Sequence, residues 1–260
     1  MNEIRPKKRL GQHFLKDRNI ARKIAGSLTG KGYDTLLEIG PGTGMLTRCL
    51  IERGFHDLWV VEIDRESVDF LRSDLPDLRN IIEGDFLTLD IGGLFRNSLA
   101  VTGNFPYNIS SQIFFRILAH RDKITEVCCM LQKEVADRIC ASPGSRTYGI
   151  LSVLLQAFYR TEYLFSVPPH VFSPVPKVTS GVIRLTRNET GSLGCDESLF
   201  FRVVKTSFGR RRKMLRNSVG AEFNIKAEDY EEFHLRPEQL SVDQFVRLTN
   251  WIDEKRVKSE

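Results

Sequence analysis

Residues 35–44 read TLLEIGPGTG, a short apolar run that leads directly into three closely spaced glycines. Thr35–Ile39 has the length and composition of a buried strand, and the segment after the glycines has a helical apolar face at Leu46, Leu50 and Ile51. Glycines between a strand and a helix let the main chain approach a ligand closely, at the sheet edge where open α/β folds bind ligands. The stretch therefore predicts an α/β fold with a ligand site at this turn; an ordinary tight strand–helix connection is the alternative.

The alternation of strand and helix extends over most of the chain. Apolar residues at helical spacing (Ile20, Ile24 and Leu28) predict a helix before the glycine stretch. Further strand-like runs lie at 58–63, 80–83, 98–102, 124–131, 163–167 and 181–185. Further helical runs lie at 65–72, 109–119, 133–140 and 149–158. This order predicts a mainly parallel sheet covered on both faces.

The character of the sequence changes after Arg187. Residues 188–192 (NETGS) have the composition of a linker. The helix-like runs beyond them cover 199–207, 211–219, 227–233 and 242–254. We therefore predict an α/β domain at residues 1–190, with a basic N-terminal lead-in, and a small all-helical domain at residues 191–260.

The amino-acid composition and net charge limit which kinds of protein the chain can be. The 260 residues include 41% hydrophobic and 27% charged side chains, as in globular proteins, and a net charge of +5 mildly favours an anionic partner. Five cysteines form no CxxC pair, and Cys128 and Cys129 lie in an apolar run, which predicts core residues and no metal site. Without a signal peptide or an apolar run as long as a membrane span, we expect a cytoplasmic protein that does not associate with membranes.

Acidic residues follow the next two strands. Glu62 ends the strand after the glycines and could accept both hydroxyl protons of an adenosine ribose; a surface acid is the alternative. Asp85 could accept from an adenine amino group, with Phe86 as apolar cover. Met45 stands where the dinucleotide fingerprint needs a small residue, which argues against a pyrophosphate site.

Glycine, Glu and Asp at three successive strand ends resemble the class I S-adenosylmethionine-dependent methyltransferases, with their Rossmann-like fold. The cofactor of that class spans these three strand ends. The resemblance implies that S-adenosylmethionine contacts Gly40, Gly42, Glu62, Ile63, Asp85 and Phe86.

The stretch Asn104-Phe105-Pro106-Tyr107 ends a further buried strand. Pro106 fixes its own φ and biases Phe105 to an extended conformation, so the carbonyl of Phe105 is held rigidly and the Asn104 side-chain oxygen can point the same way. The lone pair of adenine N6 is delocalised into the ring, which makes this nitrogen a poor nucleophile. Two oxygens that accept hydrogen bonds from the amino group favour a pyramidal nitrogen with a localised lone pair. Tyr107 would stack on the base; a proline turn with a buried tyrosine is the alternative.

Over nearly its whole length the chain closely resembles the small-subunit ribosomal RNA adenine dimethyltransferases of the KsgA (RsmA) type. The landmarks are GQHFL (11–15), EIGPG (38–42), GNFPYNIS (103–110), VFSPVPKV (171–178) and RRKMLRN (211–217). The resemblance implies that His13, Leu15 and Asn104 also contact the cofactor, although His13 stands where the family often has Asn. It further implies that Phe172 flanks the target adenine opposite Tyr107; a core aromatic residue is the alternative.

Basic residues are concentrated in residues 202–216, which contain seven Lys and Arg side chains and no acid. Within this segment Arg210, Arg211, Arg212 and Lys213 are expected to contact RNA phosphates, and a solvated helix face is the alternative.

The resemblance implies dimethylation of two adjacent adenosines near the 3′ end of 16S ribosomal RNA by a monomer that acts on the small subunit during ribosome biogenesis. The residues themselves favour only methylation of an adenine amino group. The alternatives are a large-subunit ribosomal RNA methyltransferase of the macrolide-resistance type, a DNA adenine methyltransferase and a non-catalytic ribosome-assembly factor on the same scaffold.

Overall fold

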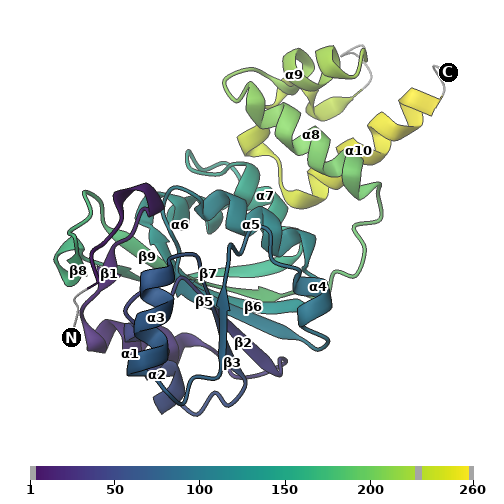
Figure 1. Cartoon of the computed structure of the whole chain (residues 1–260). Helices are drawn as coiled ribbons and strands as arrows, with labels where there is room; N and C mark the ends of the chain where they lie inside the picture. Colours follow the sequence, from purple (N-terminus) through teal and green to yellow (C-terminus); the bar gives the residue numbers. More distant parts are fainter. Residues whose placement is uncertain (1–3, 226–229, 258–260) are drawn as a thin grey trace. The chain divides into compact units, whose positions relative to one another are not determined.

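The computed structural model describes residues 4–225 and 230–257. Its centre is a seven-stranded sheet with the strand order β4-β3-β2-β5-β6-β9-β7 (Figure 1). The strands are β2 (Thr35–Ile39), β3 (Leu58–Glu62), β4 (Asn80–Glu83), β5 (Leu99–Asn104), β6 (Ile124–Gln132), β7 (Tyr159–Val167) and β9 (Ser180–Arg187). Strands β2 to β6 run parallel to one another and β9 runs antiparallel to β6, so the predicted mainly parallel sheet is confirmed.

Helices connect the parallel strands. They are α2 (Met45–Glu52), α3 (Arg65–Asp74), α4 (Ile91–Leu94) and α5 (Ser110–Ala119), and a further helix, α1 (Arg18–Ser27), precedes β2. Helix α1 begins where it does because the Asp17 side chain accepts from the amides of Asn19 and Ile20, and Asp64 caps α3 in the same way. The connections β2–α2–β3 and β5–α5–β6 run in opposite directions across the sheet, so right-handed crossovers place α2 and α5 on opposite faces (Figure 1).

The strand order reverses between β2 and β5. The loops that follow these two strands therefore lead to opposite faces and leave a crevice at the carboxyl edge of the sheet, where open α/β folds bind ligands. The glycine stretch follows β2 and the Asn104–Tyr107 stretch follows β5, so the fold brings both predicted site segments to the same place.

A second, two-stranded sheet was not predicted from the sequence. Strand β1 (Phe14–Leu15) pairs antiparallel with β8 (Phe172–Ser173), with Leu15 opposite Phe172. Next to it, the amide of Lys16 donates to the carbonyl of Val171 over 2.8 Å. This pairing joins the N-terminal segment to the 171–178 stretch.

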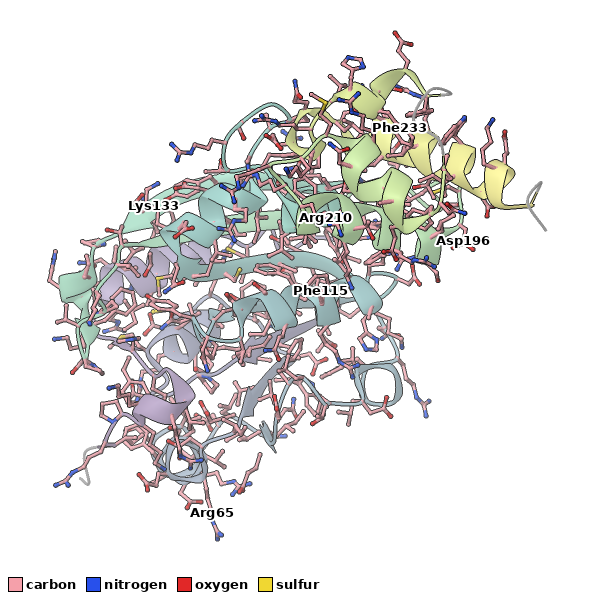
Figure 2. The ribbon with its side chains drawn as sticks, turned by 90° about the horizontal axis from the view of Figure 1, so that it is seen from above. Arg65, Phe115, Lys133, Asp196, Arg210 and Phe233 are labelled. Atoms are coloured by element: carbon pink, nitrogen blue, oxygen red, sulfur yellow. The ribbon has the colours of Figure 1, made fainter. Side chains whose placement is uncertain are left out.

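The second compact unit comprises Asp137–Arg160 and Asn188–Glu260. Its helices are α7 (Ile150–Gln156), α8 (Glu197–Gly209), α9 (Leu215–Glu222) and α10 (Val242–Val257), with the 3₁₀ turns Glu231–His234 and Pro237–Gln239. Helix α6 (Lys133–Ile139) crosses the unit boundary. Asp196 caps the start of α8 and Arg210 follows its end (Figure 2).

The unit boundary differs from the predicted boundary at residue 190, because residues 137–160 pack with the C-terminal helices. The Tyr148 and Phe208 rings are 6.3 Å apart, and the Gly144 amide donates to the carbonyl of Glu238 over 2.6 Å. Sequence periodicity gives each helix an apolar face but does not say which helix it packs against.

Two predicted helices of this unit also differ. The predicted helix at 211–219 begins only at Leu215, because Met214 is extended and residues 211–213 form a turn. Of the predicted helix at 227–233, residues 227–229 lie outside the described residues. Glu231–His234 forms a 3₁₀ turn that includes Phe233 (Figure 2), and the Phe233 ring packs against Trp251.

Candidate active site

A cavity of about 210 Å³ lies at the carboxyl edge of the sheet. The loops after β2, β3, β4 and β5 line it together with residues 9–15. Twelve residues predicted for the cofactor or the catalytic step are brought together here: His13, Leu15, Gly40, Gly42, Glu62, Ile63, Asp85, Phe86, Asn104, Phe105, Pro106 and Tyr107.

The turn after β2, at residues 40–43, lines the cavity with its glycines. Gly40 has φ +65°, and nothing lies within 4 Å of the position that a Cβ would take there, so the main chain is open to a ligand. Gly42 has φ +54°, and its Cβ would lie 2.7 Å from the Phe14 ring. Glycine at 42 therefore lets the N-terminal segment pack directly on the turn.

Glu62, at the end of β3, has a buried carboxylate held by two main-chain amides. Its Oε2 accepts from Gly42 over 3.2 Å and its Oε1 from Asp64 over 2.9 Å. Burial raises the pKa of Glu62, and the two amide hydrogen bonds oppose that shift. Each oxygen keeps a lone pair for a further donor.

The loop after β4 contributes a second carboxylate. Asp85 is half-buried, and its Oδ1 accepts from the Leu87 amide over 2.9 Å, while Phe86 is buried beside it. The Ile63 side chain also lines the cavity and is 53% exposed, a large apolar group left open to a ligand. An acceptor between two apolar side chains suits a flat heteroaromatic ring that carries an amino group.

Asp64 holds the N-terminal segment, which lines the cavity with residues 9–15, through hydrogen bonds. Its carboxylate accepts from Lys7 Nζ over 2.5 Å and from Gln12 Nε2 over 3.0 Å, and Gln12 Oε1 accepts from the Lys7 amide. Burial acts to raise the pKa of Asp64, but the hydrogen bonds from Lys7 and Gln12 outweigh burial and lower it. Sequence reasoning missed this contact, because Lys7 and Gln12 are far from Asp64 in the chain.

Asn104 meets the N-terminal segment at the main chain of His13. The Asn104 Nδ2 donates to the carbonyl of His13 over 2.8 Å. The Asn104 Oδ1 is buried, and none of the residues in the described part of the chain donates to it. A carbonyl can only accept, so His13 fixes the orientation of the amide and leaves its oxygen as an acceptor without a donor.

Tyr107 has partners at both its ring and its hydroxyl. The His13 ring stacks on it with centroids 5.4 Å apart and an interplanar angle of 26°. Its hydroxyl lies 2.6 Å from the Oγ of Ser180, and burial raises its pKa. The His13 Nδ1 donates to the carbonyl of Pro174 over 2.8 Å, which holds the imidazole in place.

Phe172 does not line the cavity. Its side chain is fully buried in the apolar cluster that includes Leu15, Ile24 and Leu46. The pairing of β8 with β1 turns Phe172 inward and Ser173 outward, since successive side chains of a strand face opposite ways. In this structure Phe172 has no exposed face to offer a base, contrary to the expectation from the resemblance.

Glu38 is a cavity residue to which the sequence analysis gave no role. It lies in β2 with 1% exposure, and its Oε2 has no hydrogen-bond partner within residues 4–225 and 230–257. Burial raises the pKa of Glu38 to about 8, with a smaller contribution from the nearby Glu62.

The predicted RNA-contacting residues belong to the second unit. Arg210 donates to the carbonyl of Asn217 over 3.1 Å, Arg211 donates to the carbonyl of Arg146, and Arg212 and Lys213 are exposed. A depression of about 410 Å³ is lined by Gly144, Arg146, Arg211, Arg212, Arg236 and Glu238. The basic surface thus includes Arg146 and Arg236, which the sequence analysis did not single out.

Residues 4–225 and 230–257 contain neither a candidate metal-binding cluster nor a candidate membrane-spanning helix. No group of three or more His, Cys, Asp or Glu side chains in that part of the chain is arranged to hold a metal ion. No helix within it has the length and apolar character needed to cross a membrane.

Comparisons with known proteins agree with this geometry. The small-subunit ribosomal RNA methyltransferase A of Parabacteroides distasonis is 57% identical over 254 residues, covering 96% of this chain and 94% of that protein. A dimethyladenosine transferase from Plasmodium falciparum has the same fold, with a TM-score of 0.75 and 23% identity over 94% of this chain and 98% of that one. The 23S ribosomal RNA methyltransferase ErmE is also similar, with a TM-score of 0.65 and 26% identity over 92% of this chain and 99% of that one. Residues 3–254 match the family model described as ribosomal RNA adenine dimethylase, and the chain belongs to that family.

Proposed function

We propose that the chain uses S-adenosylmethionine to convert two adjacent adenosines near the 3′ end of 16S ribosomal RNA into N6,N6-dimethyladenosine, acting as a monomer on the small ribosomal subunit. The observation that carries this proposal is the Asn104 amide, whose nitrogen is held by His13 and whose buried oxygen has no partner among the described residues. The family and the name of the Parabacteroides relative support the choice of RNA.

The residues around the cavity suit the parts of S-adenosylmethionine. The free lone pairs of Glu62 would accept the ribose hydroxyls, and Asp85 would accept from the adenine amino group between Ile63 and Phe86. The open main chain at Gly40 leaves room beside them. When bound, the cofactor supplies an electrophilic methyl group on a sulfonium sulfur.

The target amino group would be held by two acceptors. In the first transfer Asn104 Oδ1 and the main-chain oxygen of Phe105 would each accept one N–H of adenine N6, which favours a pyramidal nitrogen with a localised lone pair. In the second transfer N6 keeps a single N–H, which one of these two oxygens would accept. Phe105 is fully buried and precedes Pro106, so its carbonyl cannot reorient easily. Both acceptors would then be in place before substrate binds, which is the condition for electrostatic stabilisation at low reorganisation cost.

Tyr107 would stack on the target adenine after the base has left its own stack. The stacked His13 ring supports this role, because a flat heteroaromatic ring already lies against the phenol. The basic residues Arg210–Lys213 would hold the RNA through its phosphates, with Arg146 and Arg236 beside them.

The test is methyl transfer from labelled S-adenosylmethionine to purified small subunits that lack the modification and, in a parallel assay, to purified large subunits, each followed by nucleoside analysis. We expect labelled N6,N6-dimethyladenosine in 16S RNA, two per subunit at completion. Label in large-subunit RNA alone would favour the 23S alternative, and absence of label with folded protein would favour a non-catalytic assembly factor.

A further inference from the structure

Ser180 makes one hydrogen bond to which the proposed reaction assigns no role. It is the first residue of β9, its side chain is fully buried, and its Oγ lies 2.6 Å from the hydroxyl of Tyr107, which is 73 positions away in the chain. Within the described residues, the Ser180 hydroxyl forms its hydrogen bond with Tyr107.

The main chain around Ser180 is a rigid support. Ser180 is paired with Gln132 of β6, and the amide of Lys133 donates to the carbonyl of Thr179 over 2.9 Å. At the next position, Gly181, an added Cβ would lie 2.8 Å from Ala136, so this end of β9 is closely packed against its neighbours. The Ser180 hydroxyl is therefore a fixed point on the central sheet.

Tyr107, in contrast, lies in the turn between β5 and α5, outside both elements. A phenol hydroxyl lies on the axis through the ring and Cβ, so a hydrogen bond to it fixes the direction of that axis. Stacking against a flat group such as the His13 ring fixes the tilt of the ring plane instead. The two interactions restrain different motions of one side chain.

We propose that Ser180 is a positioning residue that holds Tyr107 in the orientation needed to stack on the target adenine. This inference rests on the proposed function, because it assigns the Tyr107 ring to the base. Ser180 itself touches neither substrate nor cofactor. It acts by removing conformations of Tyr107 that would otherwise have to be excluded when the base binds.

The inference predicts that the Tyr107 hydroxyl contributes even though stacking needs only the ring. Tyr107→Phe keeps the ring and removes the bond to Ser180, and Ser180→Ala removes the same bond from the other side. Each change should lower kcat/KM for RNA by about three- to tenfold, the effect of one neutral hydrogen bond. The decrease should appear mainly as a higher KM for RNA, with cofactor affinity unchanged.

The test is a double-mutant cycle with Ser180→Ala, Tyr107→Phe and the double variant, assayed on small subunits at saturating cofactor. We expect the double variant to be no more impaired than either single variant, since all three lack one shared bond. Thr249→Val serves as the matched control: it removes another fully buried hydroxyl, bonded to the Phe245 carbonyl of α10, and should leave kcat/KM unchanged.

Two outcomes would overturn the inference: unchanged kcat/KM for RNA in Tyr107→Phe, or decreases in the single variants that multiply in the double variant. If Ser180→Ala fails to fold, Tyr107→Phe alone decides, by showing or not showing the expected decrease. A parent protein that methylates no adenine would instead refute the proposed function, so the two failures are distinguishable.

Discussion

The side-chain amide of Asn104 donates to the main-chain carbonyl of His13 over 2.8 Å, although 91 positions separate the two residues. The N-terminal segment thereby fixes the orientation of the amide. The hydrogen bonds from Lys7 and Gln12 to Asp64 hold that segment, so the orientation of the side chain that we propose to be catalytic depends on interactions made by residues 7–13.

This relationship makes a prediction for Asn104→Asp. The variant keeps an acceptor at the cavity but places a carboxylate oxygen against the carbonyl of His13, where both atoms can only accept. We expect turnover to fall at least about tenfold at neutral pH, because repulsion displaces the acceptor or the N-terminal segment. Single-turnover methylation at saturating cofactor measures this, and parent-like turnover would show that the amide orientation is unimportant.

Glu62→Ala should weaken binding of S-adenosylmethionine by about 1.5–3 kcal/mol, the usual effect of removing hydrogen bonds to a charged group. Isothermal titration calorimetry on the folded variant measures it. Glu83→Ala is the matched control, because Glu83 pairs with Glu62 across β3 and β4 but is exposed and lies outside the cavity lining. Equal affinities for parent and Glu62→Ala would exclude the ribose assignment.

Glu38 predicts a dependence of stability on pH. Its folded-state pKa, about 8, lies above the unfolded value of 4.5, so folding takes up a proton between these pH values. This group's contribution to stability is therefore complete below about pH 4.5 and is lost as pH rises towards 8. Glu38→Gln removes this titrating group, so the variant should not lose the stability that the parent loses with rising pH. The difference in melting temperature, variant minus parent, should therefore increase from about pH 5 to about pH 8. A difference that stays constant over this range would contradict the raised pKa of Glu38.

Replacing Arg210, Arg211 and Arg212 together with Ala should weaken RNA binding and flatten its salt dependence, by about 0.7–0.9 in the log–log slope for each phosphate that is no longer neutralised. Affinity for S-adenosylmethionine should stay at the parent value. Replacing the exposed Arg65, Arg72 and Arg79 of the first unit with Ala is the control, because it removes the same three positive charges. If both sets of variants bind RNA equally, the basic segment is only a solvated surface.

The strands that the sequence predicts well are those whose patterns are local. Thr35–Ile39 and Asn80–Glu83 match the structure residue for residue, because each is a short apolar run bounded by turn residues. The cavity residues were predictable for a related reason: parallel strands bring their carboxyl ends to one edge, so Glu62, Asp85 and Asn104 had to lie close together.

What the sequence could not reveal depends on interactions between distant segments. Two-residue strands have no measurable periodicity, so the β1–β8 pairing was missed, and with it the inward direction of Phe172. The bond from Tyr107 to Ser180 was missed for the same reason, since a serine at the start of a strand resembles any other.

The central claim is that Asn104 accepts from the adenine amino group during methyl transfer. Asn104→Ala removes that acceptor, which matters most as the nitrogen becomes pyramidal, so turnover should fall about a hundredfold or more while RNA affinity changes little. The decisive measurement is single-turnover methylation of small subunits by Asn104→Ala at saturating S-adenosylmethionine, with cofactor and RNA affinities determined separately. A decrease of that size at unchanged RNA affinity is the predicted result, and near-parent turnover would contradict the mechanism even if the product were N6,N6-dimethyladenosine.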